Sequence, residues 1–285
     1  ICELEKQKKS VFTLVTERIL DNLYKDIVPW DKPWNGGEDC ATSYITGKPY
    51  SSLNQMLLDR SGQYLTGNQL KTLKGKHLKH SGNLLVYYEL RSYREFLKEE
   101  GGKMNPHERT SPKLTFFMVY NVEDCEGIDV SPREAKQAEN AYEKADRIIE
   151  SYIMRESLNT TKTVNFQYDN KEDVLGLAPI GEDLAEYYAA IFRMLIHSTG
   201  YKTRLNRDMG FRFGQQKYGK EELIGEIGSA YLCHKVGIFT SKRSETYKKE
   251  WARVFRANNY LFVSAANKAE RAAKYILTGE RPKEY

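Results

Sequence analysis

The chain has 285 residues, 40% of them apolar, and a formal net charge of +5 at pH 7, which suits one large packed domain or two ordinary ones. No apolar run approaches the roughly 18 residues that a membrane span needs. The four cysteines lack C-x-x-C spacing, which argues against a disulfide scaffold or zinc ribbon and favours a reducing cytoplasm. The charged N-terminal residues do not show the pattern of a secretory leader, and the first residue, Ile1, is typical of a processed or truncated chain.

The first half alternates helical and strand patterns. Apolar residues at helical spacing follow a capping Ser10 and stop before Pro29, and Thr66 is placed to cap a later helix. Two stretches rich in Val, Leu, Phe and Tyr are typical of strands. These patterns predict helices over Val11–Val28, Ser51–Arg60 and Thr66–Leu73, and strands over Leu84–Arg91 and Leu114–Val122.

Residues 98–112, between the two strands, are polar and punctuated by Gly and Pro. They predict a mobile, disorder-prone excursion from a hairpin. A domain boundary is expected near Glu126–Val130.

The second half is predicted to be mainly helical. Ser131, Pro132 and Glu134 are typical of a helix start, and that helix is expected to run to Met154. Further patterns predict a strand over Thr163–Tyr168 and helices over Glu182–Ser198, Lys220–Val236, Ser244–Asn258 and Tyr260–Leu277. The expected fold class is therefore α+β with two domains, mixed over residues 1–127 and mainly helical with a small sheet over residues 128–285.

The most informative motif is a damaged one, Arg193-Met194-Leu-Ile-His197. A zinc-peptidase helix of the form H-E-x-x-H needs two imidazoles one turn apart and a glutamate beside the first. Here Arg193 stands at the first imidazole position and Met194 at the base position. A permanent cation cannot ligate zinc, and a thioether cannot take a proton from water. We therefore expect neither a catalytic residue nor a metal cofactor here.

Glu222 and Glu226 lie one turn apart on the next predicted helix and share a face. Charges at this spacing usually form a solvated face. Carboxylates that converge on a cavity without metal repel each other, and a guanidinium can neutralise them. The sequence thus predicts a salt bridge from Arg193 to one of the two, the alternative being a surface arginine without a partner.

Aromatic and basic residues are interleaved in the first half, and residues 61–88 contain no acid. This composition suits single-stranded nucleic acid, which binds through phosphate charge and base stacking. Each of these residues also has an alternative role that does not involve nucleic acid. One tryptophan, expected to be Trp34, can fill the core, and the lysines can simply be solvated. Asn54 can instead hold the preceding loop in place. The predicted contacts are Trp30, Lys32, Trp34, Lys48, Tyr50, Asn54, Lys71, Lys74, Lys76 and Lys79.

From Ser10 to Gly279 the chain resembles the ArdC-type anti-restriction proteins of plasmids and conjugative elements. The resemblance implies an N-terminal domain that binds single-stranded DNA over residues 1–127. It implies a zincin-like metallopeptidase domain over residues 128–285. It rests on P-W-x-x-P-W at Pro29–Trp34, T-G-K-P-Y at Thr46–Tyr50, F-x-V-Y-N-V-E-D-C-E-G around Tyr120–Gly127, the helix pair of His197 and Glu226, and Ala265–Ala273.

The family pattern would make Glu222 a metal ligand and Glu226 a carboxylate that orients a histidine, or the reverse. Because the first histidine and the base are missing, we expect a non-enzymatic, cytoplasmic DNA-binding protein of a mobile element. Its expected partners are single-stranded DNA and, as an open alternative, a host restriction protein or another protein, with no membrane. Two other functions stay open. One is a peptidase that holds zinc through His197, Glu222 and Glu226, and the other is a pseudo-peptidase module that binds peptides.

Overall fold

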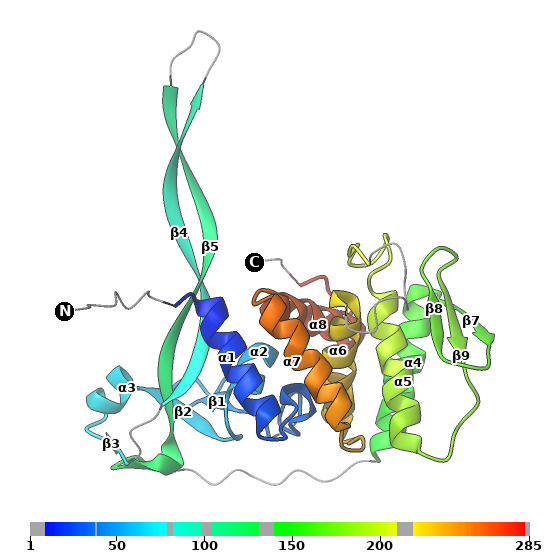
Figure 1. The fold of residues 1–285 in the computed structure, drawn as a ribbon, viewed down its shortest axis with the longest axis horizontal. Helices are drawn as coiled ribbons and strands as arrows, with labels where there is room; N and C mark the ends of the chain where they lie inside the picture. The colour runs from blue at the N-terminus through cyan, green and yellow to red at the C-terminus, as the bar shows by residue number, and fades with distance from the viewer. Residues whose placement is uncertain are drawn as a thin grey trace.

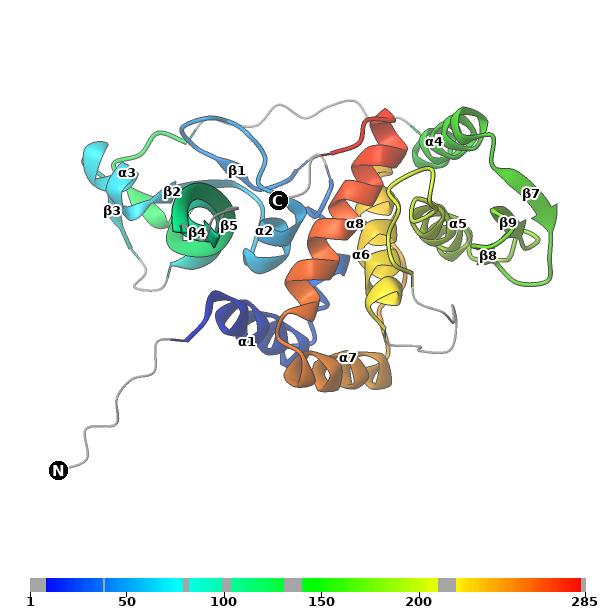
Figure 2. The same cartoon turned by 90° about the horizontal axis from the view of Figure 1, so that it is seen from above.

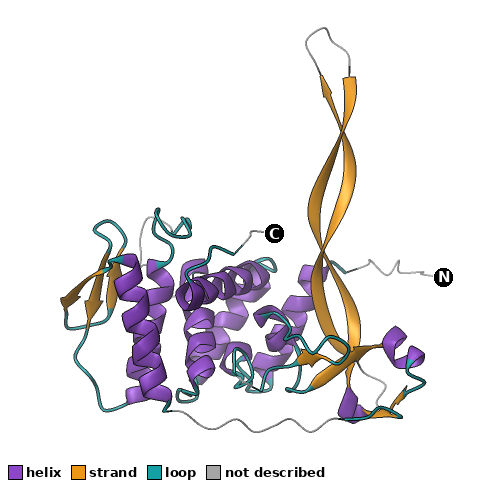
Figure 3. Ribbon diagram, turned by 180° about the vertical axis from the view of Figure 1, so that it is seen from behind, coloured by secondary structure: helices purple, strands orange, loops and turns teal. Residues whose placement is uncertain are grey.

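The computed structural model describes residues 9–37, 39–78, 82–98, 104–130, 140–209 and 219–282; the side chains of 94–98 and 104–108 are not part of that description. Most of the helices gather into one body, and a small sheet lies beside them (Figure 1, Figure 3). A long two-stranded ribbon projects from this sheet, away from the helices (Figure 1). No helix among the described residues is long and apolar enough to cross a membrane.

The helices of the first half begin where their caps predict. Ser10 and Ser51 accept hydrogen bonds from backbone amides of the first turn, and Thr66 forms a reciprocal capping box with Gln69. The first helix ends at Tyr24, earlier than predicted, because the chain turns at Asp26 with a φ of 64°. The helical segments are α1 (Val11–Tyr24), η1 (Pro29–Asp31), α2 (Ser52–Leu57), α3 (Gly67–Thr72) and η2 (Val122–Asp124).

The main sheet has the order β1-β2-β5-β4, and a second pair joins β3 to β6. The two long strands of the main sheet, β4 and β5, pair antiparallel from Asn83↔Val119 to Lys98↔Met104. The strands are β1 (Thr42–Ser43), β2 (Gln63–Thr66), β3 (Lys76–His77), β4 (Asn83–Lys98), β5 (Met104–Asn121) and β6 (Cys125–Glu126).

The prediction of a mobile excursion over residues 98–112 was wrong for residues 104–112, which belong to β5; residues 99–103 lie outside the described part. Proline misled the prediction because it cannot donate a ladder hydrogen bond. In a two-stranded ribbon each strand has one outer edge, where a missing N–H has no ladder partner to lose.

In the second half, helix α4 begins after Asn140, whose side chain caps it; the predicted start at Ser131 lies outside the described residues. The predicted strand at Thr163–Tyr168 was largely misplaced, because residues 163–166 form the connection between two strands. The elements are α4 (Ala141–Glu156), β7 (Asn159–Lys162), β8 (Gln167–Asp169), β9 (Val174–Leu177), α5 (Leu184–Ser198), α6 (Lys220–Val236), α7 (Glu245–Ala257) and α8 (Leu261–Thr278).

Helices α5, α6 and α8 lie side by side (Figure 2) and approach closely because small residues line their contacts. A Cβ added at Gly228 of α6 would come within 2.6 Å of the Ile196 side chain on α5. On α8, five alanines are fully buried in the same core: Ala265, Ala266, Ala269, Ala272 and Ala273. The short side chains therefore set the spacing that brings the damaged motif of α5 against α6.

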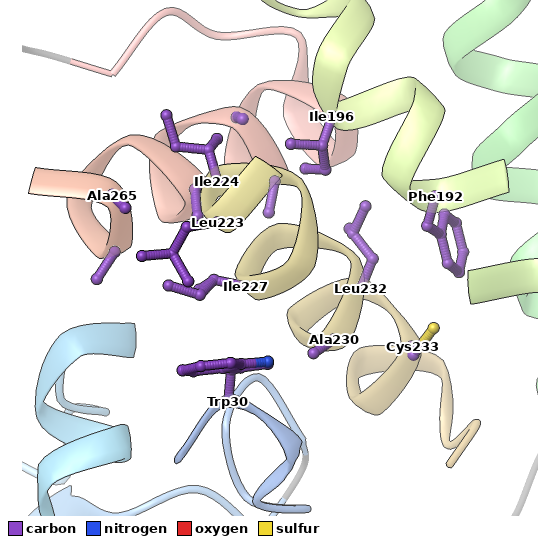
Figure 4. Packing of buried hydrophobic residues seen from close by; sticks show 14 of the residues in the cluster. Trp30, Phe192, Ile196, Leu223, Ile224, Ile227, Ala230, Leu232, Cys233 and Ala265 are labelled. Carbon is purple, nitrogen blue, oxygen red and sulfur yellow. The ribbon is translucent and has the colours of Figure 1, made fainter. Parts of the chain in front are cut away.

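The largest hydrophobic core crosses from the first half of the chain into the second. Trp30 of η1 is fully buried, below α6 in Figure 4, and its ring centroid lies 6.1 to 6.3 Å from four aromatic rings of α7 and α8. Trp34 is only partly buried and donates its indole N–H to the Gln55 carbonyl at 3.0 Å. The expectation that Trp34 is the core tryptophan was therefore wrong, because Trp30 has that role. Trp30 joins the two halves of the chain.

Replacing Trp30 tests this join. We expect Trp30→Ala to lower the free energy of unfolding by about 3–5 kcal/mol, the usual cost of deleting a buried large aromatic side chain. Trp34→Ala, the matched control, should cost clearly less because its ring is partly exposed. Urea denaturation followed by circular dichroism measures both. Equal losses in the two variants would contradict the assignment of Trp30 as the join.

Candidate functional site

Arg193 and Glu226 meet across the α5–α6 contact. The Nη1 of Arg193 lies 2.8 Å from Oε1 of Glu226, so the predicted salt bridge is confirmed. The Glu226 side chain is 11% exposed and that of Arg193 37% exposed. A carboxylate this deeply placed needs a cationic partner, because burial penalises its charged form. Arg193 supplies the charge from the position of the missing imidazole.

The other oxygen of Glu226 extends the network towards the first half of the chain. Its Oε2 accepts a hydrogen bond from the Tyr247 hydroxyl at 3.1 Å and lies 3.4 Å from Nη2 of Arg243. Arg243 also donates to Asp31 of η1 at 3.2 Å, and the Trp30 indole donates to Tyr247 at 3.1 Å. Burial raises the pKa of Asp31 to about 6, against the opposing effect of Arg243.

His197 is fully buried and faces a residue that the sequence pattern did not single out. Its Nδ1 lies 3.1 Å from Oε1 of Glu221. Arg207 holds the same carboxylate with two nitrogens, at 2.6 and 3.2 Å, and also donates to the Thr199 hydroxyl and the Ile196 carbonyl. Burial acts to raise the pKa of Glu221, but the hydrogen bonds and charges of His197 and Arg207 lower it below its usual value. His197 is thus engaged in a second, separate ion cluster.

The helical geometry of α6 explains why Glu221 rather than Glu222 faces His197. A Cβ added at Gly225 would lie 2.7 Å from the His197 ring, and Ser229 donates to the Ala189 carbonyl of α5 at 2.6 Å. Residues 221, 225 and 229 therefore form the face of α6 that contacts α5. The spacing of Gly225 and Ser229, two small residues, was the available signal in the sequence.

These clusters do not fit a metal centre. Among the described residues, no group of three or more His, Cys, Asp or Glu side chains is arranged to hold a metal ion. The alternative ligand set of His197, Glu222 and Glu226 is not brought together, because His197 pairs with Glu221 and Glu226 with Arg193. Met194 is buried in the apolar core, so the position of the missing base provides no proton acceptor.

Several predicted nucleic-acid contacts are buried and hold the fold instead. Trp30 fills the core, and Lys32, 4% exposed, donates to the carbonyls of Met56 and Leu58 at the end of α2. Burial lowers the pKa of Lys32 to about 7. The Asn54 amide exchanges two hydrogen bonds with the Val86 backbone of β4, at 2.8 and 2.9 Å. These three predictions were wrong, because each side chain satisfies buried groups and cannot reach a ligand.

The remaining predicted contacts are at least partly accessible, apart from Lys79, which lies outside the described residues. Tyr50 and Trp34 are half-buried, and burial raises the pKa of Tyr50 to about 12. The exposed ones are Lys48, in the turn that follows β1, and Lys71, Lys74 and Lys76, in and after α3. The structure does not gather the described members of the predicted set on one surface.

A row of accessible rings and a thioether lies beside the α3–β3 segment that carries Lys71, Lys74 and Lys76, and the sequence pattern missed it. Phe116 and Met118 of β5 are 42% and 40% exposed, and Tyr120 follows on the same face. The ring of His77 stacks on Tyr120 with centroids 4.5 Å apart and planes 9° apart. Gly82 lies against Met118 and Tyr120, where an added Cβ would be 3.2 and 3.1 Å from them. We call Phe116, Met118, Tyr120 and His77 the stacking strip.

Comparison with known families assigns the two halves. Residues 9–122 match the model described as the N-terminal domain of anti-restriction factor ArdC. Residues 143–268 match the model described as zincin-like metallopeptidase. The chain therefore combines an ArdC-type N-terminal domain with a zincin-like domain. The α+β class with two domains is confirmed. The stacking strip belongs to the ArdC-type domain and the Arg193–Glu226 pair to the zincin-like domain.

Relatives carry similar sequence in different settings. Two proteins named DNA primase TraC, from Escherichia coli, are each 26% identical over 96% of this chain, which spans only 20% and 28% of their lengths. The uncharacterized protein y4eC of Sinorhizobium fredii is 23% identical over 93% of this chain and 91% of its own length.

Solved structures share the fold. Crystal structures of the antirestriction ArdC protein from the R388 plasmid, metal-free and Mn(II)-bound, superpose with TM-scores of 0.67 and 0.69. They are 24% identical to this chain and cover 94% of it and 97% of their own chains. The likeness shows the fold and leaves the chemistry to the residues described above.

A double-mutant cycle tests the ion pair of the zincin-like domain. We expect Arg193→Met and Glu226→Gln to show a coupling free energy of about 1 kcal/mol in the free energy of unfolding, because the pair is partly exposed. The matched cycle with Arg193→Met and Glu222→Gln should show a coupling near zero. Urea titrations of the wild type and the five variants give both values. A coupling through Glu222 as large as that through Glu226 would refute the geometry.

Proposed function

We propose that this chain binds single-stranded DNA through its ArdC-type domain and serves a mobile genetic element as an anti-restriction protein. We further propose that its zincin-like domain does not hydrolyse peptide bonds. The observation that carries the proposal is the stacking strip, in which accessible rings on one face of a strand lie beside exposed lysines.

Stacking of bases on aromatic rings is the part of single-strand binding that tolerates any sequence. Successive same-face residues along a strand are about 6.8 Å apart, so Phe116 and Tyr120, four residues apart, are separated by about 13.6 Å. They present two separated surfaces on which unstacked bases can rest. The thioether of Met118 fills the interval and keeps it apolar. His77, already stacked on Tyr120, extends the second surface.

Lysines supply the complementary charge for phosphates. Lys71 on α3, Lys74 after it and Lys76 on β3 are exposed, and Lys76 neighbours His77 directly. Their side chains gain by neutralising phosphates and releasing counterions. Lys74 has a φ of 60°, a conformation that turns the chain sharply between α3 and β3. That turn brings the lysine-bearing segment towards the stacking strip.

Protection of entering DNA is the role that best fits these properties. A protein that coats a single strand blocks the access of a nuclease to that strand, and such coating needs no sequence preference. The ArdC protein of plasmid R388 is named for antirestriction and TraC for DNA priming, two activities concerned with DNA. We extend this to a cytoplasmic role during conjugation. A host restriction protein is a second proposed partner, which direct binding assays with that protein would test.

The DNA-binding proposal predicts distinct effects for rings and charges. Phe116→Ala should weaken binding to a labelled single strand by about 1–3 kcal/mol per base stacked, roughly 5- to 150-fold in Kd. Replacing Lys71, Lys74 and Lys76 by Gln should make the slope of log K against the logarithm of the salt concentration less steep. The expected change is about one for each lysine that neutralises a phosphate. Fluorescence anisotropy across a salt series measures both effects.

The matched controls are Phe239→Ala, an exposed phenylalanine of the zincin-like domain, and Lys242→Gln, an exposed lysine of that domain. Both should leave the affinity for DNA unchanged. Wild-type binding that does not change with salt, or equal losses in control and test variants, would remove the support for the proposed surface.

The proposed loss of peptidase activity rests on the chemistry of α5 and α6. Arg193 places a guanidinium where a zinc ligand would stand, and Glu226 is already neutralised by it. His197 is committed to Glu221, which Arg207 also holds. With Met194 in the core, no side chain at that position can activate water. We infer that the charge of a metal has been replaced by the charge of a side chain.

Restoring the motif tests this inference. The variant Arg193→His with Met194→Glu recreates two imidazoles one turn apart and the intervening carboxylate. We expect it to retain zinc after dialysis, whereas the wild type and the control Arg193→Ala with Met194→Ala retain none. Elemental analysis of the three proteins decides. Stoichiometric zinc in the wild type that is lost in Glu222→Gln would instead support the peptidase with rearranged ligands.

A further inference from the structure

The ribbon formed by β4 and β5 extends well beyond the sheet to which it belongs. Within the described part of the chain, its base contacts β2, α1, α2 and α3, and its outer part stands clear of the other elements (Figure 1). We call residues Glu89–Lys98 and Met104–Lys113 the arm. An isolated two-stranded ribbon is marginally stable in water, so an arm of this length is suited to a partner that lies along it.

The pairing register sorts the side chains of the arm onto two different faces. Residues directly opposite in an antiparallel pair share a face, and faces alternate along each strand. Arg91, Tyr93, Arg109 and Lys113 therefore share one face, since Arg91 pairs with Ser111, Tyr93 with Arg109 and Glu89 with Lys113. Among the side chains that the structure describes, the opposite face carries no charge and presents Leu90, Ser92, Thr110 and Pro112.

The charged face, over the same described side chains, has three cations and one carboxylate, and its residues are exposed. The carboxylate is Glu89, whose Oε2 lies 3.0 Å from Nε of Arg91. Both side chains are about half exposed, and such surface ion pairs contribute little to stability. A phosphate can therefore displace Glu89 from Arg91 at small cost. This face is built to meet an extended polyanion.

The dimensions select duplex nucleic acid as that polyanion. The major groove of B-form DNA is about 12 Å wide and admits a two-stranded β-ribbon. Same-face residues of a strand repeat at about 6.8 Å, which is close to the axial rise of two base pairs, since each strand of DNA carries one phosphate per about 3.4 Å of helix axis. Arginine and lysine contact the phosphates in such complexes, and tyrosine donates a hydrogen bond to them.

We propose that the charged face of the arm binds duplex DNA in a groove, with Arg91, Arg109 and Lys113 on the phosphates. The stacking strip lies at the base of the same strand β5, on the pleat face opposite Arg109 and Lys113. The ribbon twists along its length (Figure 1), so one hairpin carries both surfaces. The protein then holds a junction, with the single strand at the base of the hairpin and the duplex along the arm. Only the single-stranded part of this arrangement rests on the function proposed above.

The test uses the full chain and three labelled probes: a blunt duplex, a single strand, and the same duplex carrying that strand as a tail. In the wild type we expect binding to the blunt duplex and tighter binding to the tailed duplex than to the single strand. The triple variant Arg91→Gln, Arg109→Gln, Lys113→Gln should lose most of its affinity for the blunt duplex. It should also bind the tailed duplex no more tightly than the single strand. Its affinity for the single strand should equal that of the wild type, which also shows that it is folded.

The matched control is Ser92→Gln with Thr110→Gln, which adds bulk to the uncharged face of the same arm and should bind all three probes as the wild type does. Absence of duplex binding in the wild type, or an equal loss of single-strand binding in the arm variant, overturns the proposal. Failure of the proposed function has a different signature: the single strand alone is not bound, while the arm still binds the blunt duplex.

Discussion

The neutralisation of one nearly buried carboxylate organises this molecule. Glu226 needs positive charge and hydrogen-bond donors, and it obtains them from Arg193 on α5 and from Arg243 and Tyr247 before and on α7. Tyr247 in turn accepts from Trp30 of the first half. A single side chain thus connects the damaged peptidase helix with the tryptophan that joins the two halves. In a zinc peptidase a metal ion supplies such charge; here arginines do so.

The charged side chains at the contact of α5 and α6 form two separate clusters. Arg193 and Glu226 form one cluster, and His197, Glu221 and Arg207 form another. The charges within each cluster compensate one another. Among the described residues, no set of side chains that could ligate a metal converges on one position. A converged set of anionic ligands is stable only around a cation. Once a guanidinium stands in place of the first imidazole, separate ion pairs are the favourable arrangement.

The proposed absence of peptidase chemistry in the zincin-like domain leaves the ArdC-type domain as the carrier of the proposed function. Two predicted contacts of its tryptophan loop are closed to a ligand, because Trp30 and Lys32 satisfy the interior. The proposed surfaces use instead the accessible rings of β5 and the exposed cations of the α3–β3 segment and the arm. The zincin-like helices then act as a platform, since they receive Trp30 and so hold the hairpin in place.

The sequence alone determined most helices, because caps such as Ser10 and Thr66 and apolar spacing act within one or two turns. It also determined that position 193 lacks an imidazole, which no folding can restore, and it indicated a salt bridge from Arg193 to Glu222 or Glu226. Only the tertiary structure decided that Trp30 rather than Trp34 is buried, because its partner Tyr247 lies far along the chain. It also selected Glu221 over Glu222, because the close contact of two helices, set by Gly225, chooses which face of α6 meets His197.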